Sequence, residues 1–278
     1  MVYLENADGI FVPPVPMQHR ADEYDEAGFE RLKDMQSRHF WYIGRHRFLL
    51  RAVASHVNRK GLTGVDLGGG CGGWISYVSQ RLPNVFSELA LADSSIVALT
   101  EARGVLPPET KRYQVNLMDL GWSKRWDVAF LLDVIEHIPD AAAAMREARE
   151  AVKPGGLVFV SVPALDFFWS YNDELAHHQR RYSRDDFARL AKDADLELVD
   201  ARYFMFFLSP LYWLSRQKSS TASDDAHKAE IQANTHRIPS RFINQSLAMI
   251  FSAETPIGHW IRFPWGTSLL GVFRRMDA

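Results

Sequence analysis

The sequence has very little cysteine and no long apolar run. Cys71 is the only cysteine among 278 residues, so no disulfide can form within the chain, which is typical of a reducing compartment. The longest apolar run, Tyr203 to Leu214, is interrupted by Ser209 and Pro210 and is too short to cross a bilayer. The first residues lack a basic segment followed by an apolar one, so we expect no secretory signal and a cytoplasmic location.

The sequence also lacks an excess of charge of either sign. Its formal net charge is −2, which provides no electrostatic basis for binding nucleic acid or an anionic membrane. An apolar fraction of 47% is ample for a hydrophobic core, and the length suits one large domain with additions. We therefore expect a soluble protein with no nucleic-acid partner and no membrane span, whose oligomeric state the sequence leaves open.

Segments with the patterns of strands and helices alternate along most of the chain. The expected strands are Leu62–Leu67, Glu88–Ala92, Lys111–Val115, Asp127–Leu132, Leu157–Val162, Leu196–Tyr203 and Thr267–Phe273. Strands that alternate with helices form a parallel sheet with right-handed crossovers. We therefore predict a Rossmann-like α/β fold, with a seven-stranded, mostly parallel sheet and helices on both faces.

The predicted core carries additions on both sides. Residues 1–60 are expected to form an extended arm and a helical lid, with helices from Asp22 and over Gly44–Asn58 and a break between them. Residues 61–203 would form the core, and residues 267–278 its final strand. Residues 204–266 would form a helical insertion between strands six and seven. The polar stretch Lys218–Gln232 is its candidate mobile segment.

The stretch from Gly64 to Trp74 combines a strand, a glycine turn and the start of a helix. It places five glycines within six positions, where residues without Cβ tolerate positive φ and the close approach of a ligand. Gly68, Gly70 and Gly72 form a G-x-G-x-G pattern, unlike the G-x-G-x-x-G spacing of dinucleotide-binding turns. The alternative interpretation is an ordinary glycine-rich turn without a ligand.

Polar residues end four successive strands. Asp66 stands just before the glycines; its carboxylate would repel a phosphate but suits a cationic ligand such as S-adenosylmethionine (SAM). Ligands of parallel sheets bind beyond the carboxyl ends of the strands. With SAM as the ligand, Asp93 would accept hydrogen bonds from the ribose hydroxyls. Asn116 would pair with the adenine, which Leu117 would cover, and Asp133 would lie under the methyl donor.

The chain resembles the class I SAM-dependent methyltransferases. The residues that carry the resemblance are Val65 to Gly72, Asp93, Asp133 to Ile138 and Val152 to Gly156. Three further stretches look like a subgroup of small bacterial methyltransferases: Phe40 to Arg45, His177 to Ser183 and Pro264 to Gly271. The glycine turn departs from the Gly-Cys-Gly-Thr-Gly common in the family but keeps its spacing. The resemblance implies SAM as cofactor and a small-molecule acceptor from natural-product or glycan-type biosynthesis.

The resemblance implies an in-line displacement at a sulfonium methyl, for which the protein mainly aligns the reactants and excludes water. An alcohol or ammonium acceptor also needs a general base. His137 is a candidate because imidazole titrates near neutral pH, although it could instead cap a turn. His178, Tyr171 and Asp133 are further candidate catalytic residues. Adjacent histidines such as His177 and His178 cannot share one face of regular structure, so we expect no metal site.

The aromatic cluster at the break between the first two helices has a possible role in binding. Trp41 and Tyr42 could close over the sulfonium, since cations are attracted to aromatic faces. Arg45 could bind the methionine carboxylate. On the loop after strand five, Arg181 could bind an acidic acceptor or pair with Asp173.

Three functions remain open at this point. The first is a SAM-dependent methyltransferase acting on an O, N or C atom of a small metabolite. The second is an enzyme that cyclises SAM to a small amino acid and releases methylthioadenosine. The third is a non-catalytic subunit of a biosynthetic complex that uses residues 204–265 as its contact surface, a segment that could also touch a lipid-linked substrate.

Overall fold

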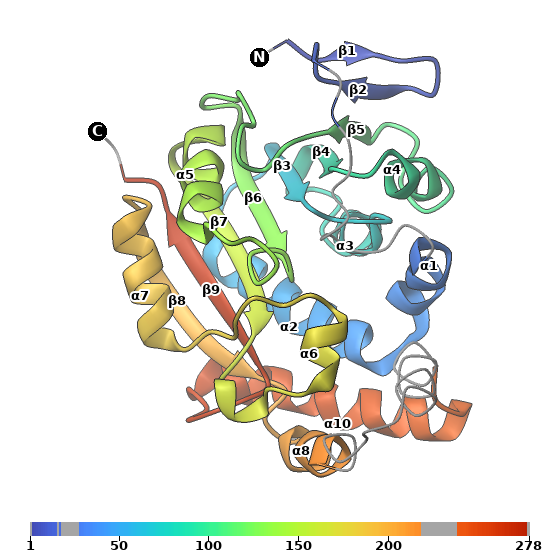
Figure 1. Ribbon diagram of the computed structural model, residues 1–278, viewed down its shortest axis with the longest axis vertical. Helices are drawn as coiled ribbons and strands as arrows, with labels where there is room; N and C mark the ends of the chain where they lie inside the picture. Colours follow the sequence, from blue (N-terminus) through green and yellow to red (C-terminus); the bar gives the residue numbers. More distant parts are fainter. Residues whose placement is uncertain (1, 16, 18–27, 218–237, 277–278) are drawn as a thin grey trace.

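The computed structural model describes residues 2–15, 17, 28–217 and 238–276, and a single sheet forms its centre (Figure 1). The strand order is β1-β2-β5-β4-β3-β6-β7-β9-β8. Neighbours from β2 to β7 are parallel, whereas β9 is antiparallel to both β7 and β8. The strands are β1 (Leu4–Glu5), β2 (Ile10–Val12), β3 (Leu62–Leu67), β4 (Phe86–Asp93), β5 (Lys111–Gln114), β6 (Trp126–Leu132), β7 (Val152–Pro163), β8 (Glu197–Phe204) and β9 (Ser268–Arg274). The mostly parallel α/β fold is therefore confirmed.

The expected number of strands was wrong, because the sheet has nine strands and not seven. The first residues were expected to be an extended arm, but β1 and β2 form an antiparallel pair, and β2 joins β5 in parallel. Gly9 turns the chain between them with a φ of 70°. Ile10 is fully buried, and Arg112 on β5 donates a hydrogen bond to the carbonyl of Asp8 at 2.6 Å. This pairing depends on residues about 100 positions apart.

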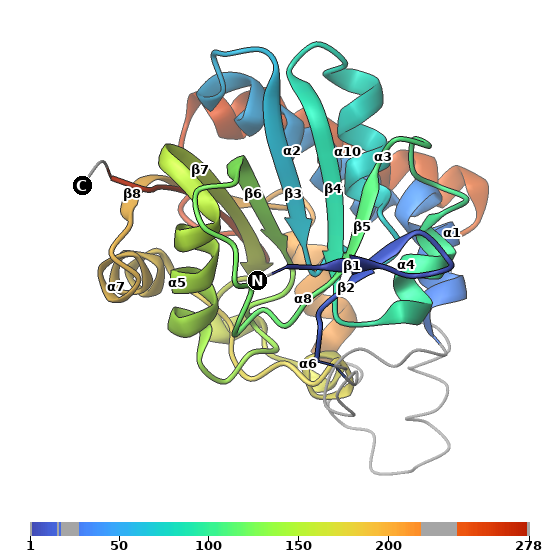
Figure 2. The same ribbon diagram turned by 90° about the horizontal axis from the view of Figure 1, so that it is seen from above.

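Helices cover both faces of the sheet (Figure 2). α5 and α7 pack on one face through Met145 and Phe187, and α2, α3 and α10 pack on the other through Phe48, Trp74 and Phe251. The helices are α1 (Phe29–Arg38), α2 (Phe40–His56), α3 (Gly73–Arg81), α4 (Ile96–Ala102), α5 (Ala141–Ala151), α6 (Tyr171–Leu175), α7 (Arg184–Asp193), α8 (Ser209–Gln217) and α10 (Arg241–Trp260), with a 3-10 turn, η2, at Asp166–Phe168.

Two expected boundaries differ from the structure. The aromatic cluster is not a break between helices, because α2 already begins at Phe40 and only His39 separates it from α1. The ring of His39 caps α2 by accepting a hydrogen bond from the amide of Trp41. The stretch Lys153 to Gly156 lies within β7, whose register against β6 shifts there. The start expected for the first helix, Asp22, and the polar stretch Lys218–Gln232 lie outside the described residues.

Candidate active site

The glycine turn follows β3 and leads directly into α3. Gly68, Gly70 and Gly72 have φ values of 75°, 56° and 77°, which lie in the left-handed region that favours glycine. A Cβ at Gly68 would also lie 2.7 Å from the side chain of Val134. Each glycine of the G-x-G-x-G pattern therefore occupies a position whose positive φ favours glycine.

Asp66 lies at the end of β3, beneath this turn. Its side chain is fully buried and lines a cavity, and its Oδ1 has no hydrogen-bond partner within the described part of the chain. Burial raises the pKa of Asp66 to about 7, against the opposing attraction of Arg45. A Cβ at Gly69 would lie 2.4 Å from its Oδ2, so the turn can pass over the carboxylate only with glycine. An unpaired buried carboxylate at a cavity wall suits a ligand cation.

Asp93, at the end of β4, has a role in the turn as well as a place in the cavity wall. Its Oδ2 accepts a hydrogen bond from the amide of Gly70 at 2.8 Å, and its Oδ1 accepts one from the amide of Ser95 at 2.9 Å. Asn116 and Leu117 line the same side of the cavity. The amide oxygen of Asn116 accepts a hydrogen bond from the amide of Met118 at 2.9 Å. The structure therefore brings the predicted nucleoside-binding residues together.

These residues line one large cavity of about 1310 Å³ at the carboxyl ends of the central strands. A volume of several hundred Å³ suffices for a drug-sized ligand, so this cavity is large enough for a nucleoside and a second molecule side by side. The wall beyond Asp133 is formed by the segments that follow β6, β7 and β8 and by α8 and α10. Its side chains include Glu136, His137, Asp173, His178, Arg181, Met205, Leu208, Leu211, Tyr212 and Leu247.

Arg45 meets Asp133 at the centre of the cavity wall. The two side chains form an ion pair, and the Arg45 guanidinium lies over the ring of Trp41 at 4.9 Å and over that of Tyr42 at 5.2 Å. Burial raises the pKa of Asp133, while the Arg45 charge opposes this rise. The aromatic rings that were expected to face a sulfonium therefore contact Arg45 in this structure. Contacts of Trp41 and Arg45 with SAM stay predictions.

An Asp–His pair, Asp173 and His178, also lines the cavity. His178 Nδ1 lies 2.9 Å from Asp173 Oδ1. Arg181 donates to both oxygens of the same carboxylate, at 2.9 and 3.0 Å, which confirms the pairing of Arg181 with Asp173. Burial raises the pKa of Asp173, but hydrogen bonds from His178 and Arg181 outweigh it and lower the pKa to about 2. A permanently ionised Asp173 holds the proton of His178 on Nδ1, which leaves Nε2 free to accept a proton.

His137 is a weaker base than its position in the sequence indicated. Burial, and then the neighbouring charge of His178, lower the pKa of His137 to about 3. The two rings are 4.8 Å apart and perpendicular to each other. His137 therefore remains neutral at physiological pH and binds protons poorly. Of the two predicted histidines, His178 is the better placed to act as a base.

Glu136 is a buried carboxyl group that the sequence analysis did not single out. Both of its carboxylate oxygens lack a hydrogen-bond partner among the described residues, and burial, together with the charge of Asp133, raises its pKa well above the usual value. Glu136, His137 and His178 each offer a ligand atom, and these atoms lie within 4.8 Å of one another, so the three could together hold a metal ion. This group differs from the adjacent His177 and His178 considered in the sequence, and the expectation of no metal stays a prediction.

Two predicted residues do not line the cavity. Tyr171 begins α6, and Gly72 caps α3 behind the turn. Asp173 lines the cavity and pairs with His178, a role that the sequence analysis did not assign to it. A capping box that joins Ser170 and Asp173 is the local signal that could have located Asp173.

More than half of the chain is similar to known proteins. Residues 35–201 match a family model described as a methyltransferase domain. The ubiquinone biosynthesis O-methyltransferase of Methylobacterium sp. strain 4-46 is 32% identical over 147 residues, which cover 50% of this chain and 57% of that protein. A protein of Mycobacterium tuberculosis named "Probable S-adenosylmethionine-dependent methyltransferase" is 26% identical over 198 residues, covering 66% of this chain and 69% of that protein. The chain spans about half the length of the first ubiquinone biosynthesis O-methyltransferases that it matches, 46% to 57%.

Solved structures share the fold at lower identity. Phosphoethanolamine N-methyltransferase 2 of Haemonchus contortus, in complex with S-adenosyl-L-methionine, aligns with a TM-score of 0.57 at 14% identity, covering 91% of this chain and 58% of that one. At this identity the alignment supports the fold alone.

Within the described ranges, no helix combines the length and the hydropathy that crossing a membrane needs.

Proposed function

Because the chain belongs to the family of SAM-dependent methyltransferase domains, we propose that it transfers a methyl group from SAM to a hydroxyl oxygen of a small acceptor with an apolar body. The observation that carries this proposal is the pair formed by Asp173 and His178, which lines the same cavity as Asp66 and the glycine turn. The names of the matched ubiquinone biosynthesis O-methyltransferases are in keeping with an oxygen acceptor.

The residues at the ends of β3 and β4 fit SAM. The unpaired Oδ1 of Asp66 would receive the ammonium group, and the turn at Gly68 and Gly70 allows the ligand to approach the backbone closely. Asp93 would accept the ribose hydroxyls while it continues to hold the amide of Gly70. When bound, SAM would supply a methyl group on a cationic sulfur, with a neutral leaving group.

The acceptor side supplies a base and an apolar surface. His178 would take the proton of the acceptor hydroxyl on Nε2, and Asp173 would stabilise the imidazolium that forms. Leu208 just before α8, Leu211 on α8 and Leu247 on α10 would contact the apolar body of the acceptor. Because these leucines offer no hydrogen bonds to sugar hydroxyls, we favour an acceptor with an aromatic or aliphatic body over a glycan.

We assign two segments to the cover of the cavity: residues 28–56, and residues 205–260 where the structure describes them. Phe29, Leu32 and Phe40 from the first segment line it, and Leu211 and Leu247 from the second line the acceptor side. Both segments would exclude water from the reacting atoms, which favours methyl transfer over hydrolysis. The buried Cys71 is in keeping with a reducing compartment, and we place the enzyme in the cytoplasm.

The test compares two neighbouring histidines. His178→Asn should lower kcat/KM by about 10²- to 10⁴-fold with a panel of phenols and alkyl alcohols, because it removes the general base, and should leave the SAM Kd unchanged. His177→Asn is the matched control, because His177 is exposed and asparagine tolerates its φ of 57°. Mass spectrometry of the product separates the reactions: S-adenosylhomocysteine supports methyl transfer, whereas methylthioadenosine alone would establish cyclisation. Equal activity of the two variants would exclude His178 as the base.

A further inference from the structure

The helix α10 has its large apolar side chains on the outside. Phe242 is 80% exposed and Trp260 is 86% exposed, and Ile243, Met249, Ile250 and Ile257 are exposed as well. The buried residues of the same helix are mostly small or polar: Asn244, Ala248, Phe251, Glu254, Thr255 and Gly258. A surface helix normally places its apolar stripe toward the core. We call the six exposed apolar side chains the outer face of α10.

Polar contacts hold the inner side of α10 to the fold. Asn244 accepts a hydrogen bond from the amide of Phe40 at 2.9 Å and donates to the carbonyl of Arg38 at 2.8 Å, so it joins the ends of α1 and α2. Glu254 accepts hydrogen bonds from the amides of Met205 and Phe207. The attachment of α10 therefore does not require the apolar residues of its outer face.

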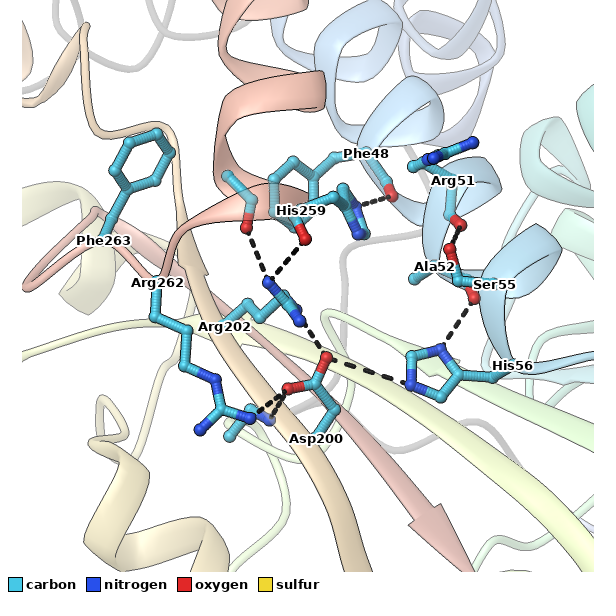
Figure 3. A network of polar contacts seen from close by, with 12 residues as sticks. Phe48, Arg51, Ala52, Ser55, His56, Asp200, Arg202, His259, Arg262 and Phe263 are labelled. Atoms are coloured by element: carbon cyan, nitrogen blue, oxygen red, sulfur yellow. Dashed lines mark hydrogen bonds and ion pairs between the residues drawn. The ribbon is translucent and has the colours of Figure 1, made fainter.

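The far end of α10 is also fixed in place. Figure 3 shows Asp200 on β8 between His56, Arg202 and Arg262. Arg202 donates to the last carbonyls of α10, those of Gly258 at 2.9 Å and His259 at 3.1 Å, where a cation is favourable. Trp260 therefore projects from a rigid support and not from a fraying end.

The charges around the outer face favour an anionic partner. Glu254 is the only acidic residue of α10, and it is fully buried. Arg241 begins the helix and Arg262 follows it, and both are exposed. Arg47 and Arg51 are exposed on α2, and Arg47 donates to Ser252 on α10. The overall charge of −2 conceals this local arrangement of four arginines around an apolar face.

A segment of the same chain and a second copy of the protein are two possible partners for the outer face of α10, and both fit it less well than a bilayer. The residues outside the described ranges have only Met1, Tyr24 and Ile231 as large apolar side chains, too few to cover it. In an antiparallel two-fold pairing with a second copy, the Arg241 end of each helix would lie against the Arg262 end of the other. The helix offers no exposed acid to Arg241, because Glu254 is buried and Asp200 already pairs with Arg262. A bilayer with anionic headgroups matches both the apolar face and the arginines.

We propose that the outer face of α10 docks on an anionic membrane surface, from which the cavity receives an acceptor with a hydrophobic body. The second half of this proposal rests on the proposed function. α10 contributes Leu247 to the cavity wall, and α8 contributes Leu211, which is 54% exposed at the rim. The helix α10 therefore has apolar side chains both at the cavity wall and on its outer face, which would give an amphiphilic molecule apolar contacts on both sides of the helix.

Vesicle sedimentation of the full chain tests the docking. We expect binding to vesicles of phosphatidylcholine with phosphatidylglycerol, and weaker binding to phosphatidylcholine alone. The double variant Met249→Gln/Trp260→Gln should reduce the partition coefficient about tenfold or more, because it removes two exposed apolar anchors. Val97→Gln/Met276→Gln, which changes two exposed apolar residues outside α10, is the matched control and should bind as the unaltered protein does. Arg51→Gln/Arg241→Gln should weaken binding to the anionic vesicles alone.

Other measurements distinguish failure of docking from failure of the proposed function. SAM binding by calorimetry should be the same in all these variants, because none of the residues lines the cavity. Normal SAM binding without any binding to vesicles would overturn the docking proposal and leave the methyltransferase proposal intact. The docking proposal would also be overturned if the unaltered protein forms a stable dimer that is lost in the Met249→Gln/Trp260→Gln variant. That result would show that the outer face of α10 is a contact between two copies.

Discussion

Binding of SAM should depend on pH through the carboxyl group of Asp66. Burial raises the pKa of this group to about 7, and its Oδ1 has no partner among the described residues. An ammonium group binds the ionised carboxylate and not the neutral acid. Acidification through pH 7 therefore protonates Asp66 and weakens SAM binding, whereas an exposed aspartate with a pKa near 4 would be ionised throughout this range.

The expected magnitude follows from the ionised fraction. With a pKa of about 7, roughly ten-elevenths of Asp66 is ionised at pH 8 and roughly one-eleventh at pH 6. If the ionised carboxylate binds only SAM with a protonated α-amino group, whose pKa is about 7.8, Kd rises about fourfold from pH 8 to pH 6, equivalent to about 0.8 kcal/mol. The stability of the free protein should change in the opposite sense. Because the pKa of Asp66 in the folded protein lies above the value near 4 of an exposed aspartate, stability is lost as pH rises from about 4 to 7, by up to about 4 kcal/mol.

Isothermal titration calorimetry with two ligands separates Asp66 from the other titrating groups of the cavity. Methylthioadenosine has the adenosine and the sulfur but no ammonium group, so its Kd should be nearly constant from pH 6 to 8 while that of SAM changes. The Asp66→Asn variant should bind SAM weakly at every pH from 6 to 8. The same substitution should raise the melting temperature of the free protein at pH 8, because it removes a buried carboxylate. Equal pH profiles for the two ligands would refute the assignment of Asp66 to the ammonium.

Three further predictions concern the turn, the helix packing and metal. Asp93→Ala should raise the SAM Kd at least tenfold by calorimetry, because Asp93 also holds the amide of Gly70; an unchanged Kd would show that the ribose binds elsewhere. Gly44→Ala should lower the free energy of unfolding in urea by about 1–3 kcal/mol, because its Cβ would lie 2.1 Å from the ring of Phe251, and an unchanged midpoint would contradict this packing of α2 on α10. Dialysis against a chelator should leave turnover unchanged; a loss that a divalent ion restores would assign the ion to the group around Glu136.

The turn and the strand ends illustrate what a local pattern can establish. Gly68, Gly70 and Gly72 were assigned from spacing alone, and each has the positive φ that makes glycine necessary. Asp66, Asp93 and Asp133 were placed at strand ends, and they meet because parallel strands end at one edge of the sheet. These features depend on backbone conformation within a few residues, so the sequence contains enough information to predict them.

Contacts between distant segments needed the tertiary structure. The pairing of Arg45 with Asp133 joins α2 to β6, and burial by surrounding elements makes His137 a weak base. The addition of β1 and β2 to the sheet likewise depends on β5, about 100 residues away. Strand pairing and pKa shifts of this kind depend on what surrounds a residue in space, which one-dimensional spacing does not describe.

The sequence by itself therefore determined the α/β fold, the glycine turn and the acidic residues at the strand ends that line the cavity. The tertiary structure made His178 the better candidate for a base, because burial lowers the pKa of His137 whereas the carboxylate of Asp173 contacts His178. It also decided which side of α10 faces outward, because an amphipathic pattern fixes two faces of a helix but not which of them meets the core.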